Sequence, residues 1–563
     1  MLRRLLFILL IAPAAIGQQR IVSGTTRLTF DETSLRAAGL RLLSVTPTDT
    51  PPGPGISQFL IRGKSEAYVL TNGEVRGYLI NAGGFILSSG ARVLRINNFT
   101  IGQRVNELIL FAGTLPVFRA AATITADTTS RTVRVPSTAM AVTNELAQAF
   151  GGVTAGAIAG TLAIEGSTAP ADPATVPPAG TTPPGLAITP IITPGDLTFC
   201  ELFDLRQVGR AGDRVALAAA TTSWNIGNQK LDWWRRPDWR HPYIVLNLYR
   251  IRDDRFEQLG QSWVKHGFFA LSESQCSTEC TEVTNGTQLA PGCTDTYESG
   301  TNANQDTLGP RSEIDPWQGV WESQNAHGSN HPHGVLDHRL TVRDADFAPA
   351  LNTGATYFLE GYYVHYQDTD VMNSAAWKPV TITAGMPGGV WRFGMSPNTT
   401  RPNIGFAIDA WTGAQRTIIA ESGTPIKFQS NDGRGVLAAK AQDLRNGTWR
   451  YTYALLNVDI NRQIGAFRVT IPSGATATDI GFAAPPHTET LNSPGGIAID
   501  NASWSSNTTA TAVTWTTTTN PLRWGTAYTF WFTTTAPPGT TSVAVTLFRD
   551  SMITISASTV GPH

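Results

Sequence analysis

Four of the chain's nine histidines lie in one short polar stretch, "NAHGSNHPHGVLDHRL", at residues 325–340. They are His327, His331, His333 and His338. Zinc and copper sites use neutral imidazoles and need about three ligands that converge on the ion. On a strand, His331 and His333 would face one side, and Asp337 could orient the ring of His338. The stretch predicts either a divalent metal site or a solvated polar loop.

A second group of residues could bind a ligand through aromatic rings and positive charge. In "LDWWRRPDWRHPY" the candidates are Trp233, Trp234, Trp239, Arg240 and Tyr243. Exposed indole and phenol rings stack on the apolar faces of sugars, and guanidinium groups bind hydroxyls or uronate carboxylates. The alternative interpretation is that the rings belong to the hydrophobic core and the arginines form its solvated rim.

Four further residues could act as acid, base or nucleophile. Lys265 and His266 lie among aromatic residues in "SWVKHGFFALS", where burial and a neighbouring charge would lower the pKa of the histidine. Glu313 and Asp315 in "LGPRSEIDPW" could act as paired carboxylates. The alternatives are a structural hydrogen bond for His266 and an ion pair between Glu313 and Arg311. Asp-rich turns such as "YQDTD" and "NQDT" could hold calcium, but neither matches the EF-hand spacing.

The four cysteines are Cys200, Cys276, Cys280 and Cys293. An even number of cysteines in an exported chain predicts disulfides, and four cysteines allow three pairings. We favour Cys280–Cys293, which closes a short loop, with Cys200–Cys276 tying the region to its first strand. Zinc ligation is the alternative, and an oxidising location argues against it.

The elements that would position these residues are β-strands in an exported chain. "MLRRLLFILLIAPAAIGQQR" has Arg3 and Arg4, followed by an apolar run and small residues, which predicts a signal peptide over residues 1–17. No later segment has the ~18 apolar residues of a membrane span. The formal net charge is −1 and charged residues make up 15%, so nothing indicates binding to nucleic acid or to an anionic membrane.

Composition divides the mature chain into four parts. We expect an N-terminal β-sandwich at 18–165, a linker at 166–196, a Cys/His-containing β domain at 197–380 and a C-terminal β-sandwich at 381–563. The linker contains eight prolines, which fix φ and cannot donate to a central strand. In the Cys/His-containing domain, the low-hydrophobicity stretch at about 272–335 predicts a long loop region stapled by disulfides.

One helix is expected in the first domain. In "STAMAVTNELAQAFG", Ser137 or Thr138 could cap its start, and Gly151 would end it. The same domain resembles the HtaA type of secreted bacterial domain over 57–165, through "GGFILSSGARVLRINNFTIG", "LPVF" and "MAVTNELAQAFG". Some HtaA domains bind haem through a tyrosine and a histidine. Here the domain has no histidine and only Tyr68 and Tyr78, so the resemblance implies the fold without haem.

Residues 221–300 and 441–548 resemble an uncharacterised family of exported proteins from planctomycetes and related environmental bacteria. The strings that carry this resemblance are "TTSWNIGNQKLDW", "HPYIVLNLYR", "RFEQLGQSWVKHGFFALS", "CTDTYESGTN", "LGPRSEI", "NGTWRYTYALLNV" and "NPLRWGTAYTFWF". The family would have a cysteine where this chain has Trp224, and it implies an exported bacterial β protein without a known activity.

The sequence therefore predicts an all-β, multidomain protein that is secreted or held at the cell surface. The function that it favours is binding of an extracellular glycan or matrix polymer. The alternative is a metal-dependent enzyme acting on a polysaccharide or another extracellular polymer, with zinc, copper or calcium as the ion. The ion would be held by the histidines of 327–338, with His266 as a further catalytic group.

Overall fold

The computed structural model of the chain shows two compact units, Met1–Thr193 and Pro194–His563. The residues it describes are 18–46, 56–61, 66–71, 74–89, 92–96, 99–104, 106–127, 129–177, 195–277, 279–280, 282–321, 332–395, 401–421, 425, 427, 432–486 and 500–563. The expected signal peptide at 1–17 lies outside them. All the strand pairs are antiparallel, and the all-β multidomain fold class is confirmed.

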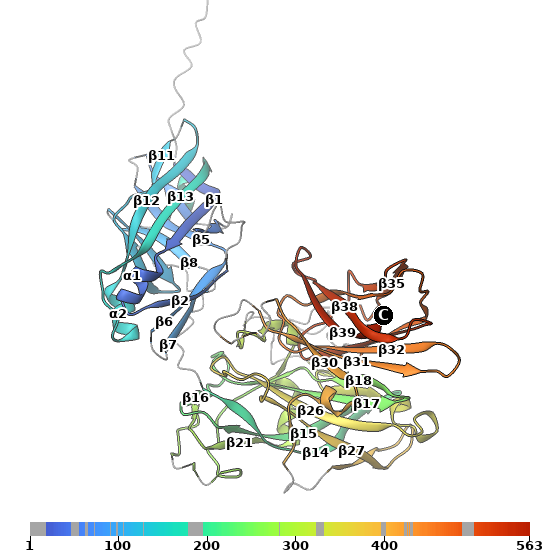
Figure 1. Cartoon of the computed structure of the whole chain (residues 1–563). Coiled ribbons are helices and arrows are strands. Elements are labelled where there is room, and N and C mark those ends of the chain that lie inside the picture. The colour runs from blue at the N-terminus through green and yellow to red at the C-terminus, as the bar shows by residue number, and fades with distance from the viewer. Residues whose placement is uncertain are drawn as a thin grey trace, which may run out of the picture. The chain divides into compact units, whose positions relative to one another are not determined.

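The first unit has a ten-stranded sheet that closes on itself and a three-stranded sheet that shares its core (Figure 1). Its strands are β1 (Gln19–Phe30), β2 (Arg41–Thr46), β3 (Ile56–Leu60), β4 (Glu66–Val69), β5 (Val75–Asn81), β6 (Gly84–Ser89), β7 (Arg92–Ile96), β8 (Phe99–Arg104), β9 (Glu107–Ala112), β10 (Leu115–Ala120), β11 (Thr125–Asp127), β12 (Thr132–Val142) and β13 (Ile158–Pro170). The large sheet runs β10-β9-β8-β5-β4-β1-β13-β12-β11, β3 pairs with β1, and β10 also pairs with β12. The small sheet runs β2-β6-β7.

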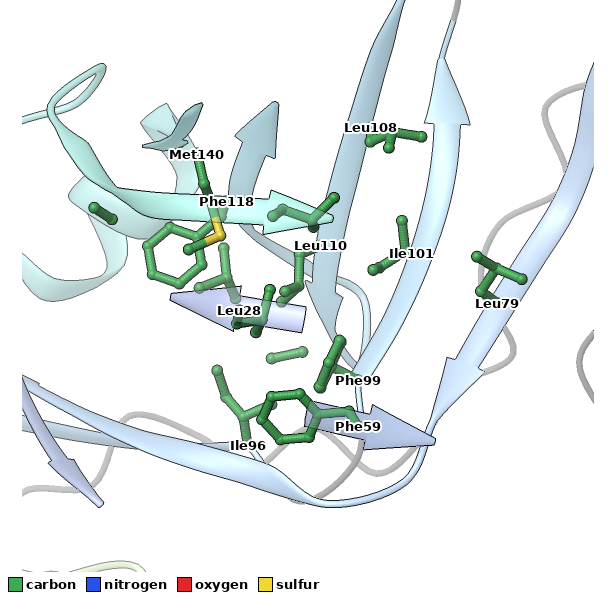
Figure 2. Close-up of a cluster of buried hydrophobic side chains, with 14 of the residues drawn as sticks. Leu28, Phe59, Leu79, Ile96, Phe99, Ile101, Leu108, Leu110, Phe118 and Met140 are labelled. Carbon is green, nitrogen blue, oxygen red and sulfur yellow. The ribbon is translucent and has the colours of Figure 1, made fainter. Parts of the chain in front are cut away.

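Apolar side chains fill the space that these two sheets enclose. Figure 2 shows Leu28, Phe59, Phe99, Leu110 and Phe118 pointing into this core from different strands. The Phe59 and Phe99 rings meet edge to face with centroids 5.0 Å apart, a geometry that aromatic pairs prefer. Among the described residues of this unit, no Asp, Glu, Lys, Arg or His is buried.

Two short helices cover the first unit. Asp31 caps α1 (Glu32–Ala37), and Thr143 caps α2 (Asn144–Phe150) by accepting from the Leu146 N–H at 3.1 Å. Helix α2 ends at Gly151, whose φ is 66°, as the sequence predicts. The predicted start at Ser137 or Thr138 is wrong. These residues belong to β12, which pairs with β13. Residues of β12 before and after them alternate between buried and exposed, as in a strand.

The proline-rich segment predicted as a linker starts inside a strand. Strand β13 continues to Pro170, where it pairs with Gln19, and a short 3₁₀ turn η1 (Pro173–Thr175) follows. A proline can close the end of a strand because no further ladder bond is needed there. The rest of the segment, 178–194, lies outside the described residues, and the linker remains a prediction.

The second unit stacks four sheets with an apolar core between each neighbouring pair (Figure 1). The first sheet has β14 (Leu197–Ala211), β15 (Arg214–Asn225), β21 (Thr294–Tyr297) and β25 (Leu340–Arg343). The second has β17 (Tyr243–Arg252), β18 (Arg255–Gln261), β19 (Val264–His266), β22 (Leu308–Gly309), β26 (Thr356–Val364), β27 (Ala375–Ala384), β28 (Arg392–Met395) and β29 (Asn403–Ile404).

The third sheet has β30 (Gln415–Ile419), β31 (Gly435–Asp443), β32 (Trp449–Asn457), β34 (Thr478–Ala483) and β37 (Thr526–Thr534). The fourth has β33 (Ile464–Thr470), β35 (Ser505–Thr509), β36 (Ala512–Thr516), β38 (Pro538–Leu547) and β39 (Thr554–Pro562). Two small pairs are β16 (Leu231–Asp232) with β20 (Gln288–Leu289) and β23 (Ile314–Asp315) with β24 (Val320–Trp321). The short helical turns are α3 (Ser299–Asn302), η2 (Gln305–Thr307), η3 (Arg311–Glu313), η4 (Asp344–Asp346), η5 (Pro349–Leu351) and η6 (Ala407–Ala410).

Strands of the second sheet are buried on both faces, which explains their nearly continuous apolar sequence. In β17, Ile244 and Leu246 face the first core, whereas Val245 and Tyr249 face the next. The sheet continues past residue 380, where the sequence predicts a domain boundary, because β27 crosses this position and pairs with β28 and β29.

Polar residues are also buried between the second and third sheets. Arg311 donates to the carbonyls of Ser262 at 2.8 Å and Gly525 at 2.7 Å, and to Asn247 Oδ1 at 2.9 Å. Asn247 in turn donates to Glu360 Oε1 at 2.8 Å. These bonds join segments that lie far apart in the sequence, and they satisfy groups whose burial would otherwise be costly.

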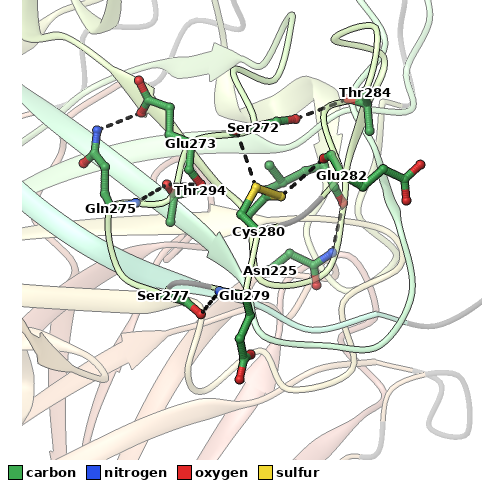
Figure 3. The surroundings of a disulfide bond; sticks show 12 residues. Asn225, Ser272, Glu273, Gln275, Ser277, Glu279, Cys280, Glu282, Thr284 and Thr294 are labelled. Carbon is green, nitrogen blue, oxygen red and sulfur yellow. Dashed lines mark hydrogen bonds between the residues drawn. A yellow bond between two sulfur atoms is a disulfide. The ribbon is translucent and has the colours of Figure 1, made fainter.

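Two disulfides clamp the segment that the sequence predicts to be stapled. They are Cys200–Cys276 and Cys280–Cys293, so the favoured pairing is confirmed. Figure 3 shows the second bond among polar side chains, where Thr294 Oγ1 donates to the Glu273 carbonyl at 3.0 Å. The bonds hold a loop that has few apolar residues of its own. Within the described part of the chain, no helix is long and apolar enough to cross a membrane.

Candidate functional site

The segment with the tryptophans and arginines forms a braced loop between β16 and β17. We call residues 234–240, "WRRPDWR", the aromatic loop. Its ends are joined by a bond from the Trp234 N–H to the Arg240 carbonyl at 2.9 Å, and a turn inside it is closed by Asp238 N–H and the Arg235 carbonyl at 3.2 Å. The Arg240 guanidinium binds both carboxylate oxygens of Asp238. The loop is therefore ordered by its own bonds.

The five predicted ligand-binding residues divide into two buried and three partly exposed side chains. Trp233 and Tyr243 are 0% exposed and belong to the cores. The Trp233 indole N–H donates to Tyr297 Oη at 2.8 Å, and Tyr243 Oη donates to the Trp239 carbonyl at 2.6 Å. These two residues support the loop from below.

Trp234, Trp239 and Arg240 are partly exposed at the surface. The Arg240 guanidinium lies 5.0 Å from the centroid of the Trp234 ring, within the range of a cation–π contact. Trp239 packs edge to face on Tyr366 with centroids 4.9 Å apart. The two indoles are thus held in place while part of each remains open to solvent.

A pair of histidines lies buried next to the loop. His241 Nε2 and His266 Nδ1 are 2.9 Å apart, so one ring donates and the other accepts. Burial, with the nearby charge of Lys265, lowers the pKa of His241 to about 3, and its ring is neutral at pH 7. The His266 ring centroid lies 4.5 Å from that of Trp321, whose indole N–H donates to Glu313 Oε2 at 2.7 Å.

Lys265 and Asp295 are also buried close to this pair. Lys265 Nζ donates to the His266 carbonyl at 2.6 Å and lies over the rings of Phe268 and Tyr297, at 4.1 and 4.8 Å. Burial lowers the pKa of Lys265 to about 7 and raises the pKa of Asp295 to about 7. An amine of this pKa could serve as a base or a nucleophile. The candidate catalytic residues Lys265, His266 and Glu313 are each 2% exposed, so protein covers them in this conformation.

Two of the four candidate metal ligands can be placed, because His327 and His331 lie outside the described residues. The rings of His333 and His338 have centroids 4.9 Å apart. His333 Nε2 lies 3.0 Å from Asp306 Oδ1, and the His338 ring stacks on Trp263 with centroids 3.7 Å apart. Over the described ranges, no three His, Cys, Asp or Glu side chains are grouped so that they could hold a metal ion.

Arg236 connects the three regions that the sequence identifies separately. Its guanidinium lies 5.7 Å from the Trp321 ring centroid and donates to the Asp306 carbonyl at 3.4 Å. The carboxylate of Asp306 meets His333, and Trp321 contacts His266. The aromatic loop, the buried histidines and the described end of the histidine-rich stretch therefore adjoin one another. Asp306 and Trp321 are far from the loop in the sequence, and no local pattern relates them to it.

Comparison with known proteins gives weak structural likenesses and no family. No protein-family model and no curated protein sequence matches the chain. It is similar to the C-terminal domain of HtaA from Corynebacterium glutamicum, at 12% identity and a TM-score of 0.21, over 26% of this chain and 98% of that domain.

Two further bacterial domains are similar over a larger part of the chain. One is the C-terminal domain of the antigen I/II-family protein AspA of Streptococcus pyogenes, at 7% identity and a TM-score of 0.14, over 66% of this chain and 99% of that domain. The other is the collagen binding domain of the Erysipelothrix rhusiopathiae surface protein RspB, at 8% identity and a TM-score of 0.12, over 65% of this chain and 98% of that domain. These values are too low to support an argument about function. The resemblance to the planctomycete family stays an expectation.

Proposed function

We propose that the protein is exported and binds an extracellular glycan or matrix polymer through the aromatic loop. The observation that carries the proposal is the loop itself. Its backbone is closed by hydrogen bonds, its base rests on buried Trp233 and Tyr243, and it holds Trp234 and Trp239 partly exposed beside guanidinium groups. Two disulfides in the same unit support an exported location, because thiols oxidise outside the cytosol.

The chemistry of the loop suits a carbohydrate. A pyranose ring has an apolar face of C–H groups that can stack on an indole, and hydroxyls that accept from guanidinium N–H groups. Because the loop is already ordered, less conformational entropy is lost when a ligand binds. When a sugar stacks on the partly exposed rings, apolar surface is buried, and this contributes about 25 cal/mol per Å² to the free energy of binding.

The test is a binding assay with mature protein against a panel of soluble and insoluble extracellular polysaccharides, using affinity electrophoresis and pull-down. We expect retention by at least one polymer and a loss of at least tenfold in affinity for Trp234→Ala and Trp239→Ala. The matched control is Phe269→Ala, which removes an aromatic ring that is 59% exposed outside the loop. Retention that is unchanged in both tryptophan variants would exclude the loop as the binding site.

A metal-dependent enzyme acting on such a polymer is the second candidate function. It is supported by the 4.9 Å between the ring centroids of two of its predicted ligands, His333 and His338. The carboxylate of Asp306, 3.0 Å from His333 Nε2, would orient the His333 ring. Mature protein without a His tag should then contain zinc or copper in a 1:1 ratio by elemental analysis, and His333→Ala should lose it. Because ligating imidazoles must be deprotonated, retention of the metal should fall as the pH drops below about 6.5.

A further inference from the structure

Several arginine side chains of the second unit are neutralised by carboxylates. Arg210, Arg250 and Arg462 each form ion pairs, and Arg240 is paired with Asp238 inside the aromatic loop. Arg235 and Arg236 differ from them. Among the residues that the structure describes, neither guanidinium has a carboxylate oxygen within 4.0 Å of its nitrogens.

We infer that the polymer bound by the aromatic loop is acidic, and that Arg235 and Arg236 bind the carboxylates of its uronate residues. This inference rests on the proposed binding function and specifies its ligand. Two adjacent arginines that have no carboxylate partner among the described residues lie in the same short loop as partly exposed Trp234 and Trp239. A uronate matches this pair of features, since it has an apolar ring face and a planar carboxylate on one residue.

The two arginines have different surroundings. Arg235 is exposed, whereas Arg236 is partly buried between Trp321 and the Asp306 carbonyl. The negative charges of Glu313 and Asp306 attract the Arg236 guanidinium without forming an ion pair with it. Glu313 Oε2 instead accepts a hydrogen bond from the Trp321 indole N–H. The position of Arg236 is therefore fixed before a ligand arrives, and less side-chain entropy is lost when its planar fork takes a carboxylate.

Charge balance favours a uronate over a nucleic acid. The chain has a formal net charge of −1, and Asp232 and Asp238 flank the two arginines in the sequence. A nucleic-acid surface needs an extended row of positive charges that neutralises several successive phosphates. A polymer that has one carboxylate per sugar and stacks a sugar ring on an indole requires only the two adjacent arginines.

The experiment compares each acidic polymer with its own uncharged, carboxyl-reduced form. Binding of mature protein is measured to polygalacturonate, polyglucuronate and alginate, and to the carboxyl-reduced form of each, in 20 mM and 300 mM NaCl. Dextran sulfate and single-stranded DNA serve as polyanions of other chemistry. The variants are the double substitution Arg235→Gln with Arg236→Gln, the double substitution Trp234→Ala with Trp239→Ala, and the control Arg468→Gln, which removes an exposed arginine of β33.

We expect wild type to bind at least one polyuronate at least tenfold more tightly than its carboxyl-reduced form. The arginine variant should lose this preference and keep the weaker binding, the tryptophan variant should lose both, and Arg468→Gln should match wild type. The preference should shrink in 300 mM NaCl, because salt screens exposed charges. Equal binding to charged and reduced polymers, or tighter binding to dextran sulfate or DNA, would overturn the inference and leave the binding function standing. Binding to no polysaccharide would overturn both.

Discussion

The two units of this protein are stabilised by different kinds of interior. Among the described residues of the first unit, the buried side chains are apolar apart from a few uncharged polar groups, and strands contact one another through rings and aliphatic chains. In the second unit the interior also contains buried charges, among them Arg311, Glu360, Lys265 and Asp295. Apolar packing depends on size and shape and tolerates exchange, whereas a buried charge depends on particular partners. The second unit is therefore the one where single polar substitutions should matter most.

The tryptophans allow the two interiors to be followed separately. All 15 lie in the second unit, so intrinsic tryptophan fluorescence reports unfolding there. Hydrogen exchange of the first-unit strands reports the other interior, since protected amides in a core exchange through unfolding.

The largest effect is expected from Arg311→Met in the second unit. The substitution removes the donor that serves the Ser262 and Gly525 carbonyls and Asn247, and leaves these buried acceptors without it. We expect the free energy of unfolding to fall by about 4 kcal/mol, measured by urea unfolding with fluorescence. Arg468→Met, at an exposed site, should change it by less than about 0.5 kcal/mol. Equal effects of the two variants would show that the buried network contributes little.

A smaller effect is expected from Leu110→Ala in the first unit. Leu110 is 1% exposed in the core shown in Figure 2, and its truncation should cost about 3 kcal/mol through lost burial and the cavity. Hydrogen exchange in β9 and β10 should accelerate, while the fluorescence transition in urea keeps its midpoint. A shift of that midpoint as large as the one from Arg311→Met would contradict the separation of the two interiors.

The pH dependence of stability should distinguish the units further. Burial raises the pKa of Asp295 to about 7, so the folded unit binds this proton more tightly than the unfolded chain. The stabilisation that results is present near pH 4 and is lost as the pH rises towards 7. Lys265, with its pKa lowered to about 7, has the opposite effect above pH 7, where stability increases towards pH 10.

Asp295→Asn keeps an acceptor for the Leu271 N–H, which now bonds to Asp295 Oδ1 at 2.7 Å. Relative to wild type, the variant should therefore gain about 2 kcal/mol of stability between pH 5 and pH 7. Urea midpoints at several pH values, read by fluorescence, measure it. Other buried groups with shifted pKa values, such as His241 and His365, affect both proteins equally. A variant whose stability changes with pH in parallel with wild type would show that Asp295 does not contribute to the pH dependence. Amides of the first unit should show no matching pH effect.

Sequence patterns predict the fold where a single local rule applies. Alternation and turn residues indicate the strands, and the cysteine spacing indicates the two disulfides. Gly151 ends helix α2 because its positive φ suits glycine. The start of α2 was predicted too early, since the apolar residues after Ser137 and Thr138 fit a strand as well as a helix, and only the pairing with β13 decides between them.

The candidate site could be predicted only in part for a related reason. Composition identifies the aromatic loop, but Trp233 and Trp234 are neighbours in the sequence and differ in exposure, because the chain leaving β16 turns one ring inward. The pairing of His241 with His266 follows from the register that places Tyr243 opposite His266. Asp306 and Trp321 reach Arg236 through contacts between distant segments, which no local pattern contains.

The central claim, that the aromatic loop binds an extracellular polysaccharide, can be tested most directly by hydroxyl-radical footprinting with mass spectrometry. The protein is oxidised with and without a polysaccharide that retains it, and oxidation is read at each tryptophan and at Phe269. The account predicts protection of Trp234 and Trp239 on addition of the polymer, with no change at exposed Phe269 or at partly exposed Trp531 of β37. Protection at other sites, with Trp234 and Trp239 oxidised as in the free protein, would contradict it.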